Sequence, residues 1–193
     1  MRSDNLYELP KNLQEPTDDG AARHLPGMVV PPVVLVSTSG RRVSLAEVSQ
    51  HGRVVVYCYP RTGQPDKNPP PGWDDVPGAR GCTPQSCGFR DIYSEFRALG
   101  AEVFGLSVQD TDYQRELVQR IHLPFEVLSD ADHELTRVLR LPTFVIQGNT
   151  LLKRTTLVLH KGRIEKVFYP VFPPDKNARE VLEWLRANAA QPT

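Results

Sequence analysis

The sequence lacks the features that mark several classes of protein. Its 23 acidic side chains balance its 23 basic ones, so it has no excess of the positive charge that nucleic-acid-binding proteins carry on their binding face. No apolar run approaches the ~18 residues needed to cross a bilayer. The first ten residues contain no apolar stretch ahead of a small-residue cleavage site, so we expect no secretory signal and a cytoplasmic location.

Cysteine is also scarce. The chain has three cysteines, Cys58, Cys82 and Cys87, and an odd number leaves at least one thiol outside any disulfide framework. The last two have a CxxxxC spacing with no second Cys/His pair at ligand spacing, which argues against a structural zinc site. We therefore expect neither a metal nor another cofactor.

The remaining composition describes one soluble domain with an extension. A chain of 193 residues with 39% hydrophobic and 24% charged side chains is typical of a single globular domain. Residues 1–24 are polar and contain two prolines, Pro10 and Pro16. We interpret them as an N-terminal extension, draped on the domain or partly disordered, and residues 25–193 as the domain itself.

The periodicity of apolar residues predicts an α/β domain with a central mixed sheet flanked by helices. A continuous apolar run over Arg53–Tyr59 is typical of a buried central strand. Residues 60–81 then hold six of the eighteen prolines and show no periodicity, and unstructured loops of this length are usually functional or disordered. Further strands are expected at 103–108, 125–128, 157–159 and 164–169, and helices at 83–99, 111–121, 132–139 and 177–189.

The helix expected after the long loop has the clearest pattern. Its apolar side chains recur at spacings of three and four, which places them on one helical face: Phe89, Ile92, Phe96 and Leu99. Thr83 is a candidate N-cap and Pro84 suits the first helical position. Gly100 ends the helix.

Cys82 lies immediately before this helix, where the sequence favours a reactive thiol. The first turn of a helix has unsatisfied backbone N–H groups and the positive end of the helix dipole. Both favour a thiolate, and Arg80 adds positive charge two residues away. A thiol that is ionised at neutral pH is a nucleophile or a redox centre.

Cys87 lies five residues further on, inside the helix. Five residues advance a helix by ~7.5 Å and rotate it by ~140°, whereas disulfide partners need Cα atoms within about 7 Å and Cβ atoms that face each other. The two cysteines can therefore bridge only if the first turn unwinds. Pro84 and Gly88 weaken the helix around them, which suggests a redox cycle coupled to local unfolding.

The segment Gly81–Asp91 reads GCTPQSCGFRD and resembles the GCTxxxCxFRD segment of the peroxiredoxins. The subgroup it is most similar to is PrxQ, also called bacterioferritin comigratory protein. The resemblance extends over about residues 25–190. Four further stretches agree in order: Tyr57–Pro60, Phe104–Ser107, Leu128–Asp130 and Arg154–Leu157.

The resemblance implies a thioredoxin-like fold and a thiol-dependent peroxidase acting on hydrogen peroxide or organic hydroperoxides. Cys82 matches the peroxidatic cysteine, which becomes a sulfenic acid, and Cys87 matches the resolving cysteine, which condenses with it to a disulfide. A thioredoxin-type dithiol would then reduce that disulfide. Arg154 matches the arginine that holds the thiolate and polarises the peroxide. We expect a monomer or homodimer.

The sequence departs from the family at one place. The PxxxTxxC motif of the family has a proline and a threonine where this chain has Asp75 and Ala79. The threonine hydroxyl helps to position the peroxide. We therefore expect Thr83 and Pro60 to be the substrate-binding residues, with Pro60 retaining the position of the family's proline at the end of the strand. Thr83 or Thr62 would supply the missing hydroxyl.

Other interpretations of these residues remain open at this point. The departure at Ala79 motivates a second hypothesis, a non-catalytic redox sensor or binding module that uses the same cysteine pair. A general disulfide oxidoreductase is disfavoured because the chain has no CxxC. Cys58 is interpreted as core packing, since free cysteine is among the most buried residue types, and the alternative for Arg154 is an ordinary surface arginine.

Overall fold

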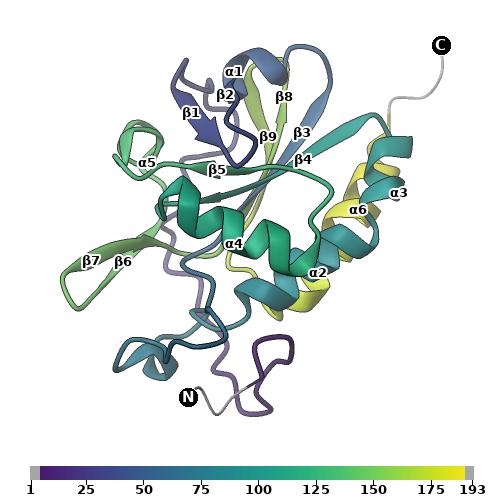
Figure 1. Cartoon of the computed structure of the whole chain (residues 1–193). Coiled ribbons are helices and arrows are strands. Elements are labelled where there is room, and N and C mark those ends of the chain that lie inside the picture. Colours follow the sequence, from purple (N-terminus) through teal and green to yellow (C-terminus); the bar gives the residue numbers. More distant parts are fainter. Residues whose placement is uncertain (1–4, 190–193) are drawn as a thin grey trace.

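A seven-stranded mixed sheet organises the computed structural model, which describes residues 5–189 (Figure 1). β3 lies near the middle, parallel to β4 and antiparallel to β8. This arrangement confirms the predicted α/β architecture with a mixed sheet. The strands, in their order across the sheet, are β2 (Arg42–Ser44), β1 (Val34–Ser37), β5 (Val127–Ser129), β4 (Ala101–Ser107), β3 (Arg53–Cys58), β8 (Thr155–His160) and β9 (Arg163–Phe168).

Helices cover both faces of the sheet. One face packs against four of them, α2 (Cys82–Asp91), α3 (Tyr93–Ala98), α4 (Thr111–Ile121) and α6 (Asn177–Ala187). The other face packs against residues 22–33 and the short helices α1 (Leu45–Val48) and α5 (Glu134–Leu139). Because successive strand side chains point to opposite faces, β3 contributes Val55 and Tyr57 to the first core and Val54, Val56 and Cys58 to the second.

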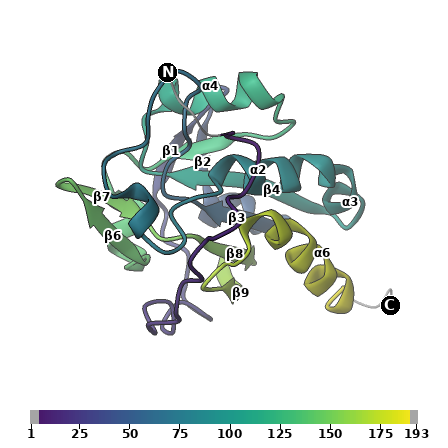
Figure 2. The ribbon, with the colours of Figure 1, turned by 90° about the horizontal axis from the view of Figure 1, so that it is seen from below.

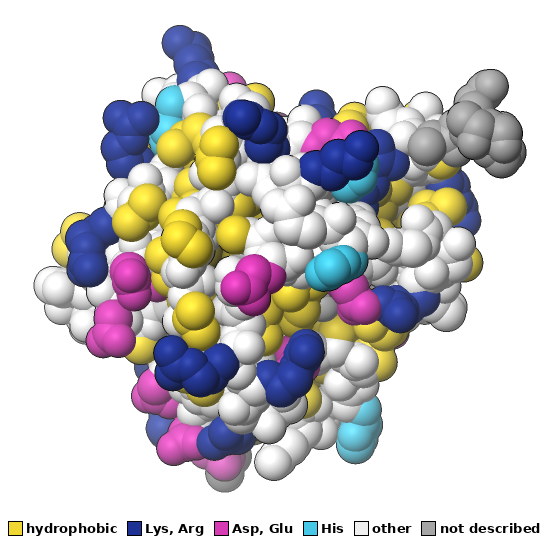
Figure 3. Space-filling view, turned by 90° about the horizontal axis from the view of Figure 1, so that it is seen from above, with side chains coloured by type: hydrophobic (Ala, Val, Ile, Leu, Met, Phe, Trp, Pro, Cys, Tyr) yellow, Lys and Arg dark blue, Asp and Glu magenta, His cyan; other side chains and the backbone are white. Residues whose placement is uncertain are grey.

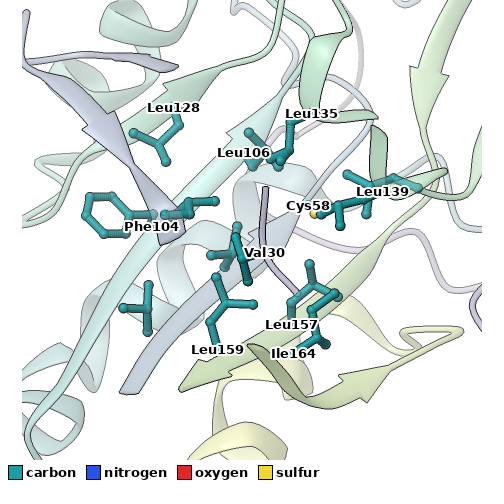
Figure 4. Close-up of a cluster of buried hydrophobic side chains, with 14 of the residues drawn as sticks. Val30, Cys58, Phe104, Leu106, Leu128, Leu135, Leu139, Leu157, Leu159 and Ile164 are labelled. Atoms are coloured by element: carbon teal, nitrogen blue, oxygen red, sulfur yellow. The ribbon is translucent and has the colours of Figure 1, made fainter. Parts of the chain in front are cut away.

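Cys58 lies inside the second core, as predicted. Only 1% of its surface is exposed, and it is surrounded by aliphatic side chains that include Leu106, Leu139 and Leu157 (Figure 4). Burial raises the pKa of its thiol far above the usual range. Cys58 is therefore a neutral core residue, on the opposite face of the sheet from Cys82.

The prediction of one continuous helix over 83–99 is wrong in two respects. The helix begins one residue earlier, at Cys82, and it is interrupted at Ile92, whose backbone (φ −118°, ψ 18°) is not helical. Phe89 and Phe96, on either side of the break, are buried, whereas Leu99 lies just beyond the end of the second piece and is exposed. Gly100 ends the second piece with φ +69°, as expected.

The sequence analysis missed a hairpin formed by β6 (Thr143–Ile146) and β7 (Asn149–Leu152). This hairpin supports the long loop. Within the loop, Trp73 begins a short 3-10 helix (Trp73–Asp75) and is 5% exposed. Its ring lies 6.2 Å from that of Phe144 in β6, and it packs with Leu151 and Ala79. The loop is thus anchored to the body of the protein just before Cys82.

The described part of the N-terminal segment, residues 5–24, lies beside this loop at the lower end of the molecule in Figure 1. On the opposite end, seen in Figure 3, basic and acidic side chains are interspersed among apolar ones. Within residues 5–189, no helix is both long enough and apolar enough to cross a membrane.

Candidate active site

Cys82 is the first residue of α2, and its side chain is 4% exposed. The N-cap is Gly81, so Thr83 is not the cap that the sequence analysis expected. No side chain caps the helix start, so the first-turn N–H groups are not occupied by a capping oxygen. The sulfur of Cys82 therefore sits at the positive end of the helix dipole.

Gly81 is required at this turn for two reasons. Its φ of +99° lies in the region that glycine adopts freely. A Cβ atom here would also collide with Pro174 and would lie only 2.8 Å from Leu9 Cδ2. The chain thus enters α2 through a narrow space between the N-terminal segment and the loop before α6.

Sheet pairing brings Arg154 to Cys82. Cys58, the last residue of β3, pairs with Thr155, the first residue of β8. Arg154 therefore lies at the edge of the sheet where the loop toward Cys82 departs. It is 4% exposed, so the alternative of a surface arginine is wrong. Its Nη2 donates to Cys82 Sγ at 3.3 Å.

The same guanidinium also fixes the backbone in front of Cys82. Arg154 Nη2 is within 3.2 Å, 3.3 Å and 2.9 Å of the carbonyl oxygens of Gly78, Ala79 and Arg80. The Ala79 carbonyl oxygen lies 3.7 Å from Cys82 Sγ. One buried cation thus holds both the sulfur and the three residues that lead to it.

The sequence analysis missed a buried polar network behind Arg154. Arg154 Nη1 donates to Gln85 Oε1, and Gln85 Nε2 donates to Asn177 Oδ1 at 2.9 Å. Asn177 Oδ1 also accepts from Thr156 Oγ1 at 2.7 Å. A signal for Gln85 was present, since it lies four residues before Phe89 and continues the buried stripe of the helix. Asn177, at the start of α6, had no comparable signal.

A small cavity of about 30 Å³ lies against Cys82. Thr83 and Ala79 line it together with Cys82. Thr62 is not among its lining residues, and the backbone N–H of Thr62 donates to Gln109 Oε1 at 3.1 Å. Pro60 is buried where β3 ends and also lies outside the cavity wall.

Cys87 lies on the same helix and is half-buried. Burial raises the pKa of its thiol, an effect that the nearby Arg90 partly offsets. Both cysteines are free thiols, and an intact helix keeps residues five apart on different sides. Gly88, interpreted above as a weak helix residue, also has a packing role, because a Cβ there would lie 3.3 Å from the Asp175 carbonyl oxygen beside α6.

The arrangement is suited to chemistry at a sulfur. It combines a thiol at a helix start, a buried guanidinium within hydrogen-bond distance, a small cavity and a second thiol nearby. Within residues 5–189, no group of three or more His, Cys, Asp or Glu side chains is placed to hold a metal ion.

Comparisons with known proteins show which family this chain belongs to. The Redoxin family model matches residues 25–182. Peroxiredoxin Q from Gentiana triflora, a chloroplastic protein, is 32% identical over 188 residues, which cover 94% of this chain and 78% of that one. This chain is a peroxiredoxin of the Q type. The peroxiredoxin Q of Oryza sativa subsp. japonica, also chloroplastic, is 35% identical over 163 residues, or 83% of this chain and 66% of that one.

Solved structures agree with the fold of this peroxiredoxin. Peroxidoxin BcpB from Mycobacterium tuberculosis superposes with a TM-score of 0.71 and 25% identity, over 86% of this chain and all of that one. The bacterioferritin comigratory protein of Xanthomonas campestris superposes with a TM-score of 0.67 and 21% identity, over 92% and 98% of the two chains. The predicted family and thioredoxin-like fold are confirmed.

Peroxiredoxins are thiol-dependent peroxidases, and this chain is an enzyme of that kind. The alternative of a non-catalytic sensor was motivated by Ala79, which lacks the family's threonine hydroxyl. In the structure the Ala79 carbonyl accepts a hydrogen bond from Arg154, and Thr83 is one of the residues that line the cavity at Cys82. The departure at Ala79 therefore does not favour the sensor.

Proposed function

We propose that this peroxiredoxin reduces hydroperoxides at Cys82 and resolves the oxidised cysteine with Cys87, and that Arg154 assists the first step. The observation that carries the proposal is the 3.3 Å contact between Arg154 Nη2 and Cys82 Sγ. A fixed positive charge at this distance stabilises a thiolate and the negative charge that develops between sulfur and oxygen. The site is 96% shielded from water at both residues, which strengthens that interaction.

The first step forms a sulfur–oxygen bond. The Cys82 thiolate attacks the terminal oxygen of ROOH, and the O–O bond breaks as the S–O bond forms. The sulfur loses two electrons and becomes a sulfenic acid, while the released RO⁻ takes up a proton and leaves as ROH. We propose that Thr83, which lines the cavity, and the first-turn N–H groups of α2 orient the peroxide. Pro60 contributes by ending β3 behind the site, without touching the substrate.

The second step forms the disulfide. The Cys87 thiol attacks the sulfenic sulfur of Cys82, the S–O bond breaks, and water leaves with the thiol proton. The first turn of α2 must unwind for this step, because residues five apart in a helix do not meet. A thioredoxin-type dithiol then donates two electrons and two protons by thiol–disulfide exchange and restores both thiols.

We also make proposals about the location, the domain organisation and the oligomeric state of the enzyme. The free thiols fit a reducing compartment such as the cytoplasm, which we propose as the location. We also propose that residues 1–24 form an extension to a catalytic domain over 25–193, and that the enzyme is a monomer or homodimer. Sedimentation of the reduced protein distinguishes the two oligomeric states.

A coupled assay tests the proposed function. Purified protein with thioredoxin, thioredoxin reductase and NADPH should oxidise NADPH when hydrogen peroxide is added. Cys82→Ser should abolish this turnover, and Cys87→Ser should lower it by at least tenfold because the sulfenic acid is no longer resolved. Cys58→Ala is the matched control and should retain turnover, since Cys58 lies on the other face of the sheet. Normal turnover by Cys82→Ser would contradict the proposal.

A further inference from the structure

We propose that residues 5–19 of the N-terminal segment form a wall of the peroxide cavity and restrict it to small hydroperoxides. This inference rests on the function proposed above. The family model matches from residue 25 onward, so the segment precedes the region that the model matches. We call residues 5–19 the strap. In Figure 2 the strap, in dark purple, crosses the start of α2.

The strap is held against the active-site loop at two points. Leu9 lies directly against Gly81, since a Cβ on that glycine would approach Leu9 Cδ2 to 2.8 Å. Further along, Pro16 Cγ would lie 3.5 Å from a Cβ on Gly78. The strap therefore runs alongside residues 78–81 in the opposite direction, directly over the residues that precede Cys82.

Both ends of the strap are attached to the rest of the protein. Near its start, the guanidinium of Arg120 in α4 lies 5.7 Å from the centre of the Tyr7 ring and donates to the Tyr7 hydroxyl at 3.4 Å. Near its end, Asp19 accepts hydrogen bonds from Lys153 Nζ at 2.6 Å and from the Tyr169 hydroxyl at 2.7 Å. These bonds hold the pKa of the Asp19 carboxyl well below its usual range.

The strap supplies one side of the cavity at Cys82. Its residues Asn5, Leu6, Glu8 and Pro10 line the cavity together with the long loop. The volume of about 30 Å³ has room for about two water-sized molecules. Hydrogen peroxide, with two oxygen atoms, is of that size. A hydroperoxide with a large organic group would bring that group against the strap as its terminal oxygen approaches the sulfur.

The strap is attached by surface contacts and can be loosened without opening a core. Asn5, Tyr7, Glu8 and Pro10 are exposed, and Leu6 and Leu9 are only partly buried. None of these residues belongs to the two sheet cores. Surface contacts of this kind contribute little to global stability, so removing them should change access to Cys82 more than it changes folding.

The experiment compares two peroxides in one variant. Tyr7→Ala with Leu9→Ala removes the contacts with Arg120 and Gly81 and leaves the cavity-lining residues and Arg154 unaltered. In the double variant, we expect the ratio of kcat/KM for cumene hydroperoxide to kcat/KM for hydrogen peroxide to be about tenfold higher than in the unsubstituted enzyme. The value of kcat/KM for hydrogen peroxide itself should stay within about twofold of that of the unsubstituted enzyme. The matched control is Asn12→Ala, an exposed position on the same strap, which should leave the ratio unchanged.

The two levels of the hypothesis fail in different ways. If the unsubstituted enzyme consumes hydrogen peroxide but the double variant shows the same ratio, or if both rates change in parallel, the strap does not select substrates. If the unsubstituted enzyme consumes no peroxide, the proposed function itself is wrong. A thermal unfolding midpoint for each variant separates a loosened strap from a poorly folded protein, and Tyr7→Ala alone provides a milder variant in that event.

Discussion

At the scale of single residues, the site depends on the set of hydrogen bonds that the buried guanidinium of Arg154 donates. Arg154 Nη1 donates to Gln85, while Nη2 reaches Cys82 Sγ and three backbone carbonyl oxygens. A lysine would keep the charge, but its ammonium is a single point charge on a flexible stem. It could not hold the helix, the loop and the sulfur in one fixed geometry.

We therefore predict that Arg154→Lys lowers kcat/KM for hydrogen peroxide by about 100-fold, which is typical of losing one positioned donor to a developing charge. The control is Arg179→Lys on the exposed side of α6, which should retain full activity. Stopped-flow measurement of peroxide consumption gives both values. A reduction of less than about threefold in Arg154→Lys would mean that charge alone, without geometry, is sufficient.

The second residue-scale prediction concerns the reactivity of Cys87. Since burial raises the pKa of this thiol above the usual value near 9, only a small fraction is ionised at neutral pH. In the Cys82→Ser variant, the alkylation rate of Cys87 should keep rising with pH between pH 7 and 9 without levelling off, because thiolate is the reactive form. Mass spectrometry of iodoacetamide-treated protein measures this rate.

The same variant unfolded in urea provides the control, where both remaining thiols should titrate with an ordinary pKa. A rate in the folded protein that levels off below pH 8.5 would contradict the prediction. The small ionised fraction of Cys87 fits its proposed role, since the resolving thiol reacts only after α2 unwinds.

At the scale of elements, the first turn of α2 is where the helix must be both well placed and able to unwind. Leu9 and Pro174 enclose Gly81 at its start, while Gln85 ties the same turn to Asn177 in α6. The absence of a side-chain cap in the described structure leaves the turn free of one interaction that stabilises most helix starts. The turn is thus held mainly by tertiary contacts.

These contacts lead to a prediction for Gly81→Ala. The substitution introduces a strained φ and places a methyl group against Pro174 and Leu9, so it should lower the free energy of unfolding by about 2 kcal/mol or more. The matched control is Gly40→Ala, where φ is +87° but nothing lies within 4 Å of an added Cβ. It should cost only the backbone strain, about 1 kcal/mol.

Urea unfolding followed by circular dichroism measures both free energies. Equal losses in the two variants would show that Leu9 and Pro174 yield freely to a methyl group, and that Gly81 is needed only for its backbone angle.

Elements also show which parts of the fold could be predicted from the sequence. The strands of the sheet and the helices that pack on it could be predicted from the spacing of apolar residues, because that spacing shows which side of each element faces the core. The β6–β7 hairpin did not, because its turn is formed by Gln147 and Gly148, both with positive φ. Asparagine or aspartate at the first position is the usual signal for such a turn. The break at Ile92 was also invisible, since the apolar spacing continues across it.

At the scale of the whole molecule, the site is assembled from segments far apart in the chain. Cys82 lies at the helix start that follows the long loop. Arg154 lies beside it because β3 pairs with β8, and Asn177 lies at the start of α6. The sequence predicted the two cysteines and the arginine through motifs that resemble a family. It could not predict the Gln85–Asn177 link or the strap, because these depend on tertiary packing that leaves no local pattern.

The central claim is that peroxide oxidises Cys82 and that Cys87 then bonds to it. Trypsin cleaves after Arg80 and Arg90, so both cysteines fall in one peptide, residues 81–90. After one equivalent of hydrogen peroxide, mass spectrometry should find this peptide about 2 Da lighter without reductant, with Cys58 still a free thiol. In Cys87→Ser, dimedone should instead label Cys82. A peptide 81–90 that keeps both thiols after oxidation would contradict the account.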